Sequence, residues 1–300
     1  MPIPERVTLI EVGPRDGLQN ELAFVPSKHK IELINQLSQT GLKHIEVTSF
    51  VSPKAVPQLA DNIEVFNTID KLPHIHYSAL VPNEHGMQEA MKVGLKNIAL
   101  FTAASESFNQ RNINCSVAES IARFKPVIDE AKAHDIHIRA YISCVLGCPY
   151  EGTIAPTQVV SVIEKLLYLG VDEISLGDTI GVGTPKQTLA LLNTVKSLLP
   201  NDRIAMHFHD TYGQAIANVY AALTAGIHRF DSAIAGLGGC PYARGASGNV
   251  ATEDVLYLMH GLGIETGIDI FKIVKAGDTI CKHLGRKNQS KVATALLANR

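Results

Sequence analysis

The stretch IAMHFHDTYGQ, residues 204–214, carries His207 and His209 at the end of a short apolar run. Side chains at positions i and i+2 of a β-strand leave from the same face, about 7 Å apart along the backbone, so both imidazoles can converge on one point. That geometry suits a metal ion. The alternative for an isolated His-x-His is a strand cap beside a hydrogen-bonded core histidine, and the rest of the chain must decide between the two.

This apolar run is one of a series of short β-type runs that recur about every thirty residues, each followed by a segment with helical periodicity. The predicted strands are 8–12, 44–48, 76–81, 97–102, 137–143, 173–176, 203–208 and 229–234. The predicted helices are 28–40, 55–69, 83–93, 117–134, 156–169, 185–198, 214–225 and 252–262, with Ser27 and Thr184 as N-caps.

Repeated strand–helix pairs in a chain slightly longer than the ~250 residues typical of a TIM barrel predict an α/β fold of the (β/α)₈ type. We expect one catalytic domain over 1–300, with extra C-terminal helices from about residue 268 that lie outside the barrel. The alternative is a doubly wound open sheet. Against it, no G-x-G-x-x-G motif follows the first strand and no Walker motif occurs.

The composition indicates a protein that acts on small molecules. The formal net charge is −2 and no basic run is present, so nothing attracts a nucleic acid or an anionic membrane nonspecifically. The five cysteines are odd in number and scattered, which predicts a reducing compartment. Neither a signal sequence nor an apolar run of ~18 residues is visible, so a cytoplasmic location is expected.

Polar residues gather where the predicted strands end, which in a barrel is one rim. They are Arg15 and Asp16 after the first strand, Glu46 in the second, Asp178 in the sixth, His207 and His209 in the seventh, and Cys240, Arg244 and Asn249 after the eighth. Each has an ordinary structural explanation, such as a turn, an ion pair or a helix cap. Their joint occurrence at one rim favours a functional site.

The residue types of this group predict its chemistry. Asp16, His207, His209 and Asn249 form a hard to intermediate ligand set, suited to Mg²⁺, Mn²⁺ or Zn²⁺ with open positions for substrate oxygens. Arg15, oriented by Glu46, could hold a developing enolate oxygen. Asp178 could take or relay a proton, and the Cys240 thiol beside these cations is a candidate proton donor or nucleophile.

The chain resembles the 3-hydroxy-3-methylglutaryl-CoA lyase family. Three segments carry the resemblance most clearly: EVGPRDGLQNE (11–21), HFHDTYG (207–213) and GLGGCPYARGASGNVATED (236–254). The similarity extends over nearly the whole chain. The first two alone mark the wider superfamily of metal-dependent barrel lyases and Claisen-type synthases. The third discriminates, because the synthases have a different glycine-rich loop without this cysteine. The resemblance implies a TIM barrel that cleaves 3-hydroxy-3-methylglutaryl-CoA to acetyl-CoA and acetoacetate, in leucine degradation and ketone-body formation.

Carried over to this chain, the resemblance implies that Asp16, His207, His209 and Asn249 bind the divalent ion, Mg²⁺ or Mn²⁺. Arg15 would contact the acyl-CoA substrate and Cys240 would be the catalytic thiol, while Glu46 and Asp178 match positions that matter in the family. In the resulting hypothesis the base is Asp178, acting directly or through His207, and Cys240 protonates the acetyl-CoA enolate held by Arg15.

Two further features of the sequence concern regulation and cellular location. Animal members of the family carry a cysteine near the carboxyl terminus that can link two subunits, and the tail VATALLANR has none, so no thiol switch is carried over. No mitochondrial leader is visible, which suggests a bacterial cytosolic form. We expect a homodimer or higher homo-oligomer. A Claisen-type synthase or aldolase, and a metal-stabilised barrel without turnover, are the competing hypotheses.

Overall fold

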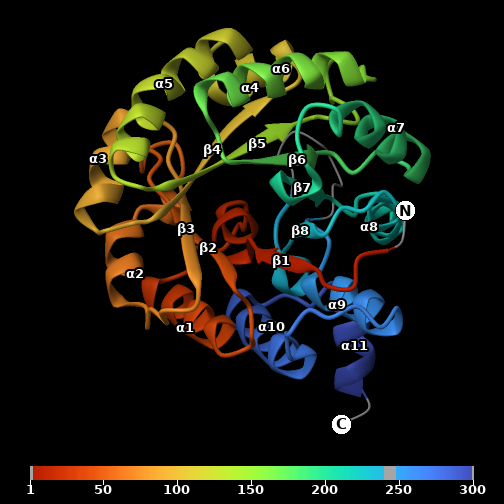
Figure 1. The fold of residues 1–300 in the computed structure, drawn as a ribbon. Helices are drawn as coiled ribbons and strands as arrows, with labels where there is room; N and C mark the ends of the chain where they lie inside the picture. The colour runs from red at the N-terminus through yellow and green to blue at the C-terminus, as the bar shows by residue number, and fades with distance from the viewer. Residues whose placement is uncertain (1–2, 240–247, 299–300) are drawn as a thin grey trace.

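The structure, a computed structural model, describes residues 3–239 and 248–298, so Cys240 and Arg244 lie outside the described residues. Within those ranges the strands close into a parallel barrel in sequence order (Figure 1), and β1 pairs with both β2 and β8. The strands are β1 Thr8–Glu11, β2 His44–Ser49, β3 His76–Leu80, β4 Asn97–Ala103, β5 His137–Ser143, β6 Glu173–Asp178, β7 Ile204–Phe208 and β8 Arg229–Ser232. The predicted TIM barrel is confirmed.

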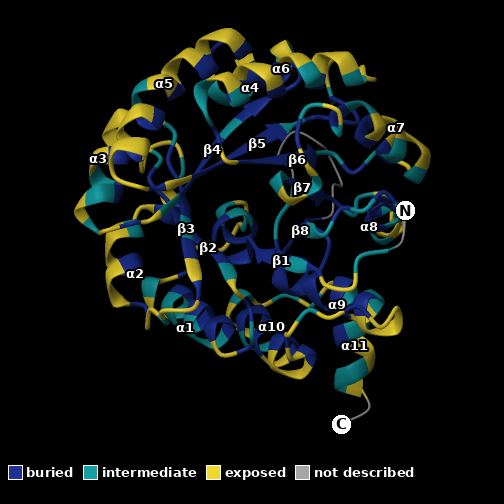
Figure 2. Ribbon diagram, in the orientation of Figure 1, coloured by how far each residue is buried: buried dark blue, intermediate teal, exposed yellow. Residues whose placement is uncertain are grey.

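Helices cover the outside of the barrel, with buried inner faces and exposed outer faces (Figure 2). They are α1 Ser27–Ser38, α2 Asn62–Thr68, α3 Glu84–Lys92, α4 Glu106–Ile113, α5 Val117–Ala133, α6 Pro156–Leu169, α7 Pro185–Val195, α8 Ala215–Thr224, α9 Thr252–Gly261, α10 Ile270–Leu284 and α11 Lys291–Ala298. Helix α4 was not predicted. The predicted helix 55–69 is shorter, since a 3₁₀ turn, Pro57–Leu59, precedes α2.

The two predicted N-caps differ in outcome. Thr184 caps α7, its side chain accepting a hydrogen bond from the backbone amide of Gln187. The prediction for Ser27 was wrong, because Pro26 occupies the cap position and Ser27 is the first helical residue. Its hydroxyl donates to Glu64 Oε2 at 2.9 Å instead, and so ties α1 to α2.

The expected C-terminal helices are α10 and α11, and α10 takes a place that the sequence did not indicate. It packs against α1 on one side and α9 on the other, which places it in the ring of helices around the strands (Figure 1). Its inner face buries Ile273, Val274 and Ile280. Helix α11 packs on α9 and α10 and is the more peripheral of the two.

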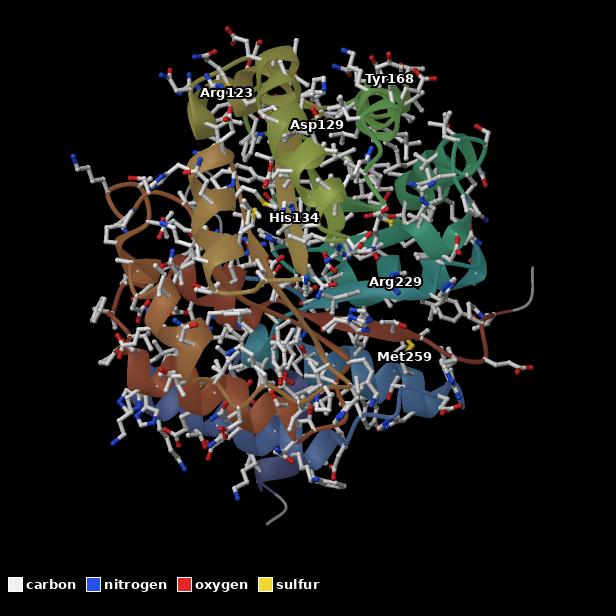
Figure 3. The ribbon with its side chains drawn as sticks, turned by 60° about the vertical axis from the view of Figure 1, so that its left-hand side comes forward. Arg123, Asp129, His134, Tyr168, Arg229 and Met259 are labelled. Carbon is white, nitrogen blue, oxygen red and sulfur yellow. The ribbon has the colours of Figure 1, made fainter. Side chains whose placement is uncertain are left out.

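A layer of charged side chains crosses the barrel interior beneath the rim. Arg139 of β5 lies 2.7 Å from Glu173 Oε1 of β6 and 2.5 Å from Asp231 Oδ1 of β8, and Arg229 lies 2.7 Å from Glu173 Oε2. Figure 3 shows Arg229 against the strands, whereas charged residues such as Arg123 and Asp129 follow the exposed side of α5. The layer links strands on opposite sides of the barrel.

Among the helices of residues 3–239 and 248–298, none has both the length and the apolar character needed to cross a bilayer.

Candidate active site and metal centre

A single π-helical turn, Gly13–Gly17, carries Arg15 and Asp16 to the rim directly after β1. The backbone amide of Asp16 donates to Val12 O at 2.7 Å, which wraps the chain tightly around the end of the strand. At Gly17 an added Cβ would lie 2.7 Å from Leu237 Cβ, so only glycine lets this turn pack against the loop after β8. Such π-turns are frequent at functional sites.

His207 in β7 and His209, which directly follows the strand, lie next to each other, as the alternation of strand side chains predicts. His207 and His209 are both buried, and their ring centroids are 5.2 Å apart. Next to them, Asn249 forms an isolated antiparallel bridge with His209, supported by a hydrogen bond from Val250 N to Phe208 O at 3.0 Å. The backbone therefore brings Asn249 to the histidines from a segment that follows β8.

Ligand atoms of Asp16, His207 and His209 lie within 4.8 Å of one another. The Asn249 amide nitrogen donates to Asp16 Oδ2 at 2.9 Å, which leaves Asn249 Oδ1 buried without a hydrogen-bond partner. His209 Nδ1 is also buried without one. Because orphaned buried polar atoms are costly, the arrangement fits a bound divalent cation that accepts oxygen and imidazole ligands.

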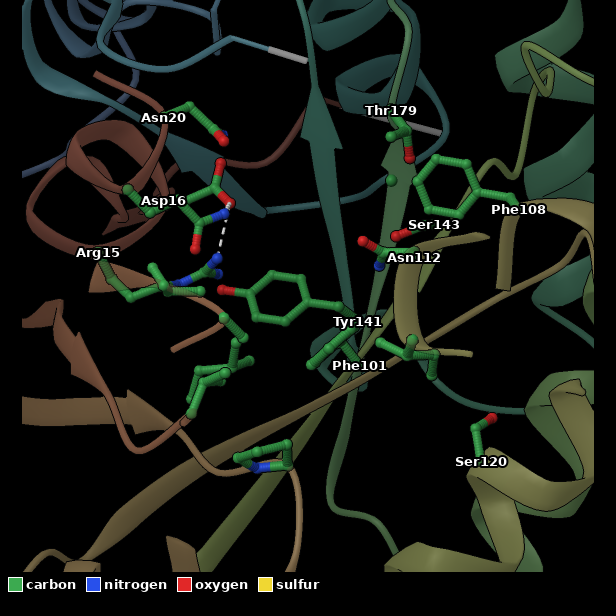
Figure 4. Close-up of a pocket in the computed structure, with 18 of the residues that line it drawn as sticks. Arg15, Asp16, Asn20, Phe101, Phe108, Asn112, Ser120, Tyr141, Ser143 and Thr179 are labelled. Carbon is green, nitrogen blue, oxygen red and sulfur yellow. Dashed lines mark hydrogen bonds and ion pairs between the residues drawn. The ribbon is translucent and has the colours of Figure 1, made fainter. Parts of the chain in front are cut away.

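The electrostatics give Asp16 and His209 the protonation states that metal ligands need. Burial alone would raise the pKa of Asp16, but the charge of Arg15, whose Nη1 lies 2.6 Å from Asp16 Oδ1, lowers it to about 2 (Figure 4). Burial lowers the pKa of His209 to about 4. At neutral pH the carboxylate is ionised and this imidazole is neutral.

Arg15 is held by more than its aspartate neighbour. Its Nε donates to Glu46 Oε1, and the other oxygen of Glu46 accepts a hydrogen bond from the Tyr141 hydroxyl at 3.0 Å. The guanidinium carbon also lies 5.3 Å from the centre of the Tyr141 ring, within cation–π range. The expected orientation of Arg15 by Glu46 is present in the structure, and Tyr141 is an additional member that the sequence analysis missed.

His207 is oriented by a buried carboxylate that was also missed. Its Nδ1 lies 3.2 Å from Asp231 Oδ2, and Ser175 donates to the same oxygen at 2.8 Å. Burial favours the neutral acid, but the charge of Arg139 outweighs it and lowers the pKa of Asp231. A carboxylate on one ring nitrogen fixes the tautomer and leaves the other nitrogen as a ligand.

Asp178 lies at the end of β6 and is fully buried. It accepts hydrogen bonds from Val182 N at 3.2 Å and Gly183 N at 2.9 Å. Burial raises its pKa to about 6 although these amides lower it. Its neighbours Gly177 and Thr179 line the rim cavity, but Asp178 is not among the described residues that do so. The carboxylate is thus held by the amides of the loop that leads to α7, behind the residues that line the cavity.

Two further buried carboxyl groups fasten the loops that carry the site. Glu11 accepts hydrogen bonds from Gly13 N at 2.8 Å and Ile234 N at 2.9 Å, and Glu253 accepts from Ala235 N at 3.0 Å. Burial raises the pKa of Glu11 to about 7 and that of Glu253 to about 8. They join the turn after β1 to the 3₁₀ turn Ile234–Gly236 that follows β8.

The rim encloses a cavity of about 600 Å³. One end holds Arg15 and the metal-ligand group, and the other reaches α4 and α5 (Figure 4). The walls of that far end include Phe101, Phe108, Asn112, Ser120 and Phe124. Gly239, which precedes Cys240 in sequence, lines the cavity as well. The cavity thus has one end at Arg15 and the metal-ligand group, and a far end where aromatic rings lie beside Arg123 and uncharged polar side chains.

Comparison with known proteins now decides the family. The model of the HMGL-like family matches residues 6–280. The chain belongs to the HMGL-like family. It is 56% identical over 298 residues to the "3-hydroxy-3-isohexenylglutaryl-CoA/hydroxy-methylglutaryl-CoA lyase" of Pseudomonas aeruginosa, covering 99% of both chains. It is 56% identical over 293 residues to the cytoplasmic 3-hydroxy-3-methylglutaryl-CoA lyase of Mus musculus, covering 98% of this chain and 85% of that one.

A crystal structure of hydroxymethylglutaryl-CoA lyase from Pseudomonas aeruginosa superposes on all of both chains with a TM-score of 0.98 and 55% identity. The resemblance found in the three sequence segments is thereby confirmed, as is the expectation that this HMGL-like protein is an enzyme of the hydroxymethylglutaryl-CoA lyase type.

Proposed function

We propose that this protein cleaves 3-hydroxy-3-methylglutaryl-CoA to acetyl-CoA and acetoacetate, a step of leucine degradation and ketone-body formation. One observation carries the proposal: a guanidinium, Arg15, lies beside a buried metal-ligand group at the charged end of a single cavity. The two relatives at 56% identity are both named as lyases of this kind.

The proposed metal ligands are Asp16, His207, His209 and Asn249, the last through its unpartnered Oδ1. An Mg²⁺ or Mn²⁺ ion bound there would supply Lewis acidity toward the oxygens of the substrate. The ionised Asp16 and the neutral His209 support this assignment, and so does Asp231, which holds the His207 ring from behind.

The reaction needs one proton removed and one delivered. The proposed base is Asp178, which takes the proton of the tertiary hydroxyl, and the electron pair of the O–H bond becomes the new carbonyl as the carbon–carbon bond breaks. Arg15 binds the enolate oxygen of acetyl-CoA through guanidinium donors that Glu46 and Asp16 hold in place. Cys240 delivers the second proton to the enolate carbon.

A wider acyl specificity is a second candidate. The Pseudomonas aeruginosa relative is named for 3-hydroxy-3-isohexenylglutaryl-CoA as well, and the far end of the cavity here carries the rings of Phe101, Phe108 and Phe124. An apolar branch longer than methyl would lie against such rings. Parallel assays with both thioesters measure this directly: equal kcat/KM values support the wider specificity, and activity on the methyl substrate alone removes it.

The central experiment is an acetoacetate assay of the purified protein, before and after EDTA and after Mg²⁺ or Mn²⁺ is returned. Release of acetoacetate that EDTA abolishes and metal restores supports the proposal. Consumption of acetyl-CoA with an oxo-acid would support a Claisen-type synthase instead. Metal loss that unfolds a protein without turnover would support a purely structural metal.

The proposed setting is a cytoplasmic homodimer or higher homo-oligomer. Named relatives occur in both the cytoplasm and mitochondria, so fractionation of the source cells tests the compartment. Light scattering of the purified chain, compared with the 32.4 kDa of one subunit, tests the assembly.

A further inference from the structure

A second group of metal-ligating side chains lies on the outside of the barrel, between α1 and α10. It consists of His29 and Glu32 from α1 and His283 from α10, and their ligand atoms lie within 4.8 Å of one another. Figure 1 shows the two helices side by side. The small hollow around this group shares no lining residue with the rim cavity in the described part of the chain.

Regular spacing on both helices builds this group. Residues three, four and seven positions apart share one helical face. The facing positions are His29, Glu32, Leu33 and Gln36 on α1, and Ala276, Thr279, Ile280 and His283 on α10. The apolar members pack the two helices together, and this packing fixes the polar members opposite one another.

The distances match those between ligands around one ion. Glu32 Oε2 lies 3.6 Å from His29 Nδ1 and 3.5 Å from His283 Nε2, so the carboxylate oxygen sits between two imidazole nitrogens. Both separations exceed those of ordinary N–H···O hydrogen bonds. Two ligands bound tetrahedrally at 2.0–2.2 Å from a zinc ion are about 3.4 Å apart.

Two buried atoms in the same hollow have no hydrogen-bond partner, which supports the presence of a bound ligand there. His29 Nδ1 is buried without a hydrogen-bond partner, and so is Gln36 Oε1, whose amide nitrogen donates to Glu32 at 3.3 Å. The His29 and His283 rings stack with centroids 3.6 Å apart, so both bind one ion only when the rings turn toward the wider 5.2 Å separation that the rim histidines show.

We propose that His29, Glu32 and His283 form a second metal site, for a borderline divalent ion of the Zn²⁺ class. Two imidazoles and one carboxylate select such an ion over Mg²⁺. Access is open, since the side chains of Glu32 and His283 are 40% and 34% exposed. The bound ion links α10 to α1, the first α-helix of the ring, and so stabilises the closure of that ring.

The test counts Zn²⁺ per chain by elemental analysis after equilibrium dialysis of the EDTA-treated protein. The unmodified chain should hold two equivalents, and His283→Asn or Glu32→Gln should hold one. A chain with His207→Ala and His209→Ala should also hold one, and adding His283→Asn to it should leave none. The matched control is His74→Asn, an exposed histidine in the turn before β3, which should keep both equivalents.

A thermal readout covers the case in which a combined variant folds poorly. In the unmodified chain Zn²⁺ should raise the melting temperature in the presence of saturating Mg²⁺, and that rise should vanish in His283→Asn but persist in His74→Asn. Equal Zn²⁺ counts in the unmodified chain and His283→Asn would overturn the proposal. A melting shift that survives His283→Asn would do the same. Acetoacetate release by His283→Asn should be unchanged.

Discussion

The charged layer inside the barrel and the polar group at its rim use the same residue types to different ends. In the layer, the carboxylates of Glu173 and Asp231 each lie within 2.7 Å of a guanidinium nitrogen. At the rim, Asn249 Oδ1 and His209 Nδ1 are buried with no partner. The opposite charges of the layer pair within the chain and hold the strands together, although Arg139 Nε and Glu173 Oε1 form their ion pair without a hydrogen bond. The two rim atoms have no hydrogen-bond partner and are free to bind a ligand.

Asp231 belongs to both regions. One oxygen binds Arg139 in the layer, and the other lies 3.2 Å from His207 at the rim. The comparison therefore predicts which substitutions remove activity, which remove stability and which remove both.

The largest effect is expected at the rim itself. Replacing His207 and His209 together with Ala removes two of the proposed ligands, and acetoacetate release should fall on the order of 10³-fold or more because a bound metal supplies several kcal/mol of charge stabilisation. The far-ultraviolet circular dichroism should stay unchanged. Metal-dependent turnover in this variant would place the metal elsewhere.

Arg15→Lys should lower kcat by roughly 10²- to 10³-fold, because a point charge does not reproduce the planar donors that Glu46 and Asp16 orient. Metal affinity, measured by titration calorimetry, should change little. Near-normal turnover would remove Arg15 from the proposed mechanism. Cys240→Ser is a parallel test of the proposed proton donor, with binding kept and turnover slowed.

The next pair of variants separates the two regions. Asp231→Asn should lower metal affinity or activity about 10- to 100-fold and also cost about 3–5 kcal/mol of stability, because Arg139 loses a buried partner. Glu173→Gln is the matched control, with a similar stability loss and little change in metal affinity. If Asp231→Asn and Glu173→Gln lost metal affinity equally, the charged layer and the rim could not be assigned separate roles in stability and metal binding.

The pH profile tests Asp178. Burial raises its pKa to about 6, and a base must be ionised, so kcat should rise with pH through that value and be about tenfold lower at pH 5 than at pH 7. In Asp178→Asn the residual rate should lose this limb. A limb that persists unchanged in the variant would assign it to another group.

The smallest effect concerns Glu253, which holds a loop rather than a ligand. Its folded pKa of about 8 lies above the value of 4.5 for an exposed group, so the folded state binds more protons between these values. The free energy of unfolding should therefore fall as the pH rises through this window, and Glu253→Gln should flatten that fall. Denaturant titrations at several pH values measure it.

Local sequence signals predicted most of the fold. The strands follow from short β-type runs that recur about every thirty residues, and β5 has the predicted bounds. Helix α4 was missed because ESFNQRNI is short and mostly polar, so it resembles a loop. The position of α10 was missed because amphipathicity shows that a helix packs on something, but does not show that the gap it fills lies between α1 and α9.

The site residues also divide into those that the sequence predicted and those that it missed. Arg15, Asp16, His207 and His209 stand at strand ends, where a barrel makes function expected, and the structure brings them together. The sequence analysis missed three site residues that lie inside strands: Arg139, Tyr141 and Asp231. A polar residue inside a strand does not by itself indicate a functional role. The available signal was the alternation of Arg139 with Tyr141 along a strand otherwise rich in apolar residues.

The hydrogen bond from Asn249 to Asp16 joins residues 233 positions apart. During synthesis, a ribosome exposes Asp16 long before the segment after β8 has been translated. Until then the aspartate lacks its amide partner and the first strand lacks the last as its neighbour. The barrel therefore cannot close, and the complete ligand set cannot assemble, until almost the whole polypeptide has emerged.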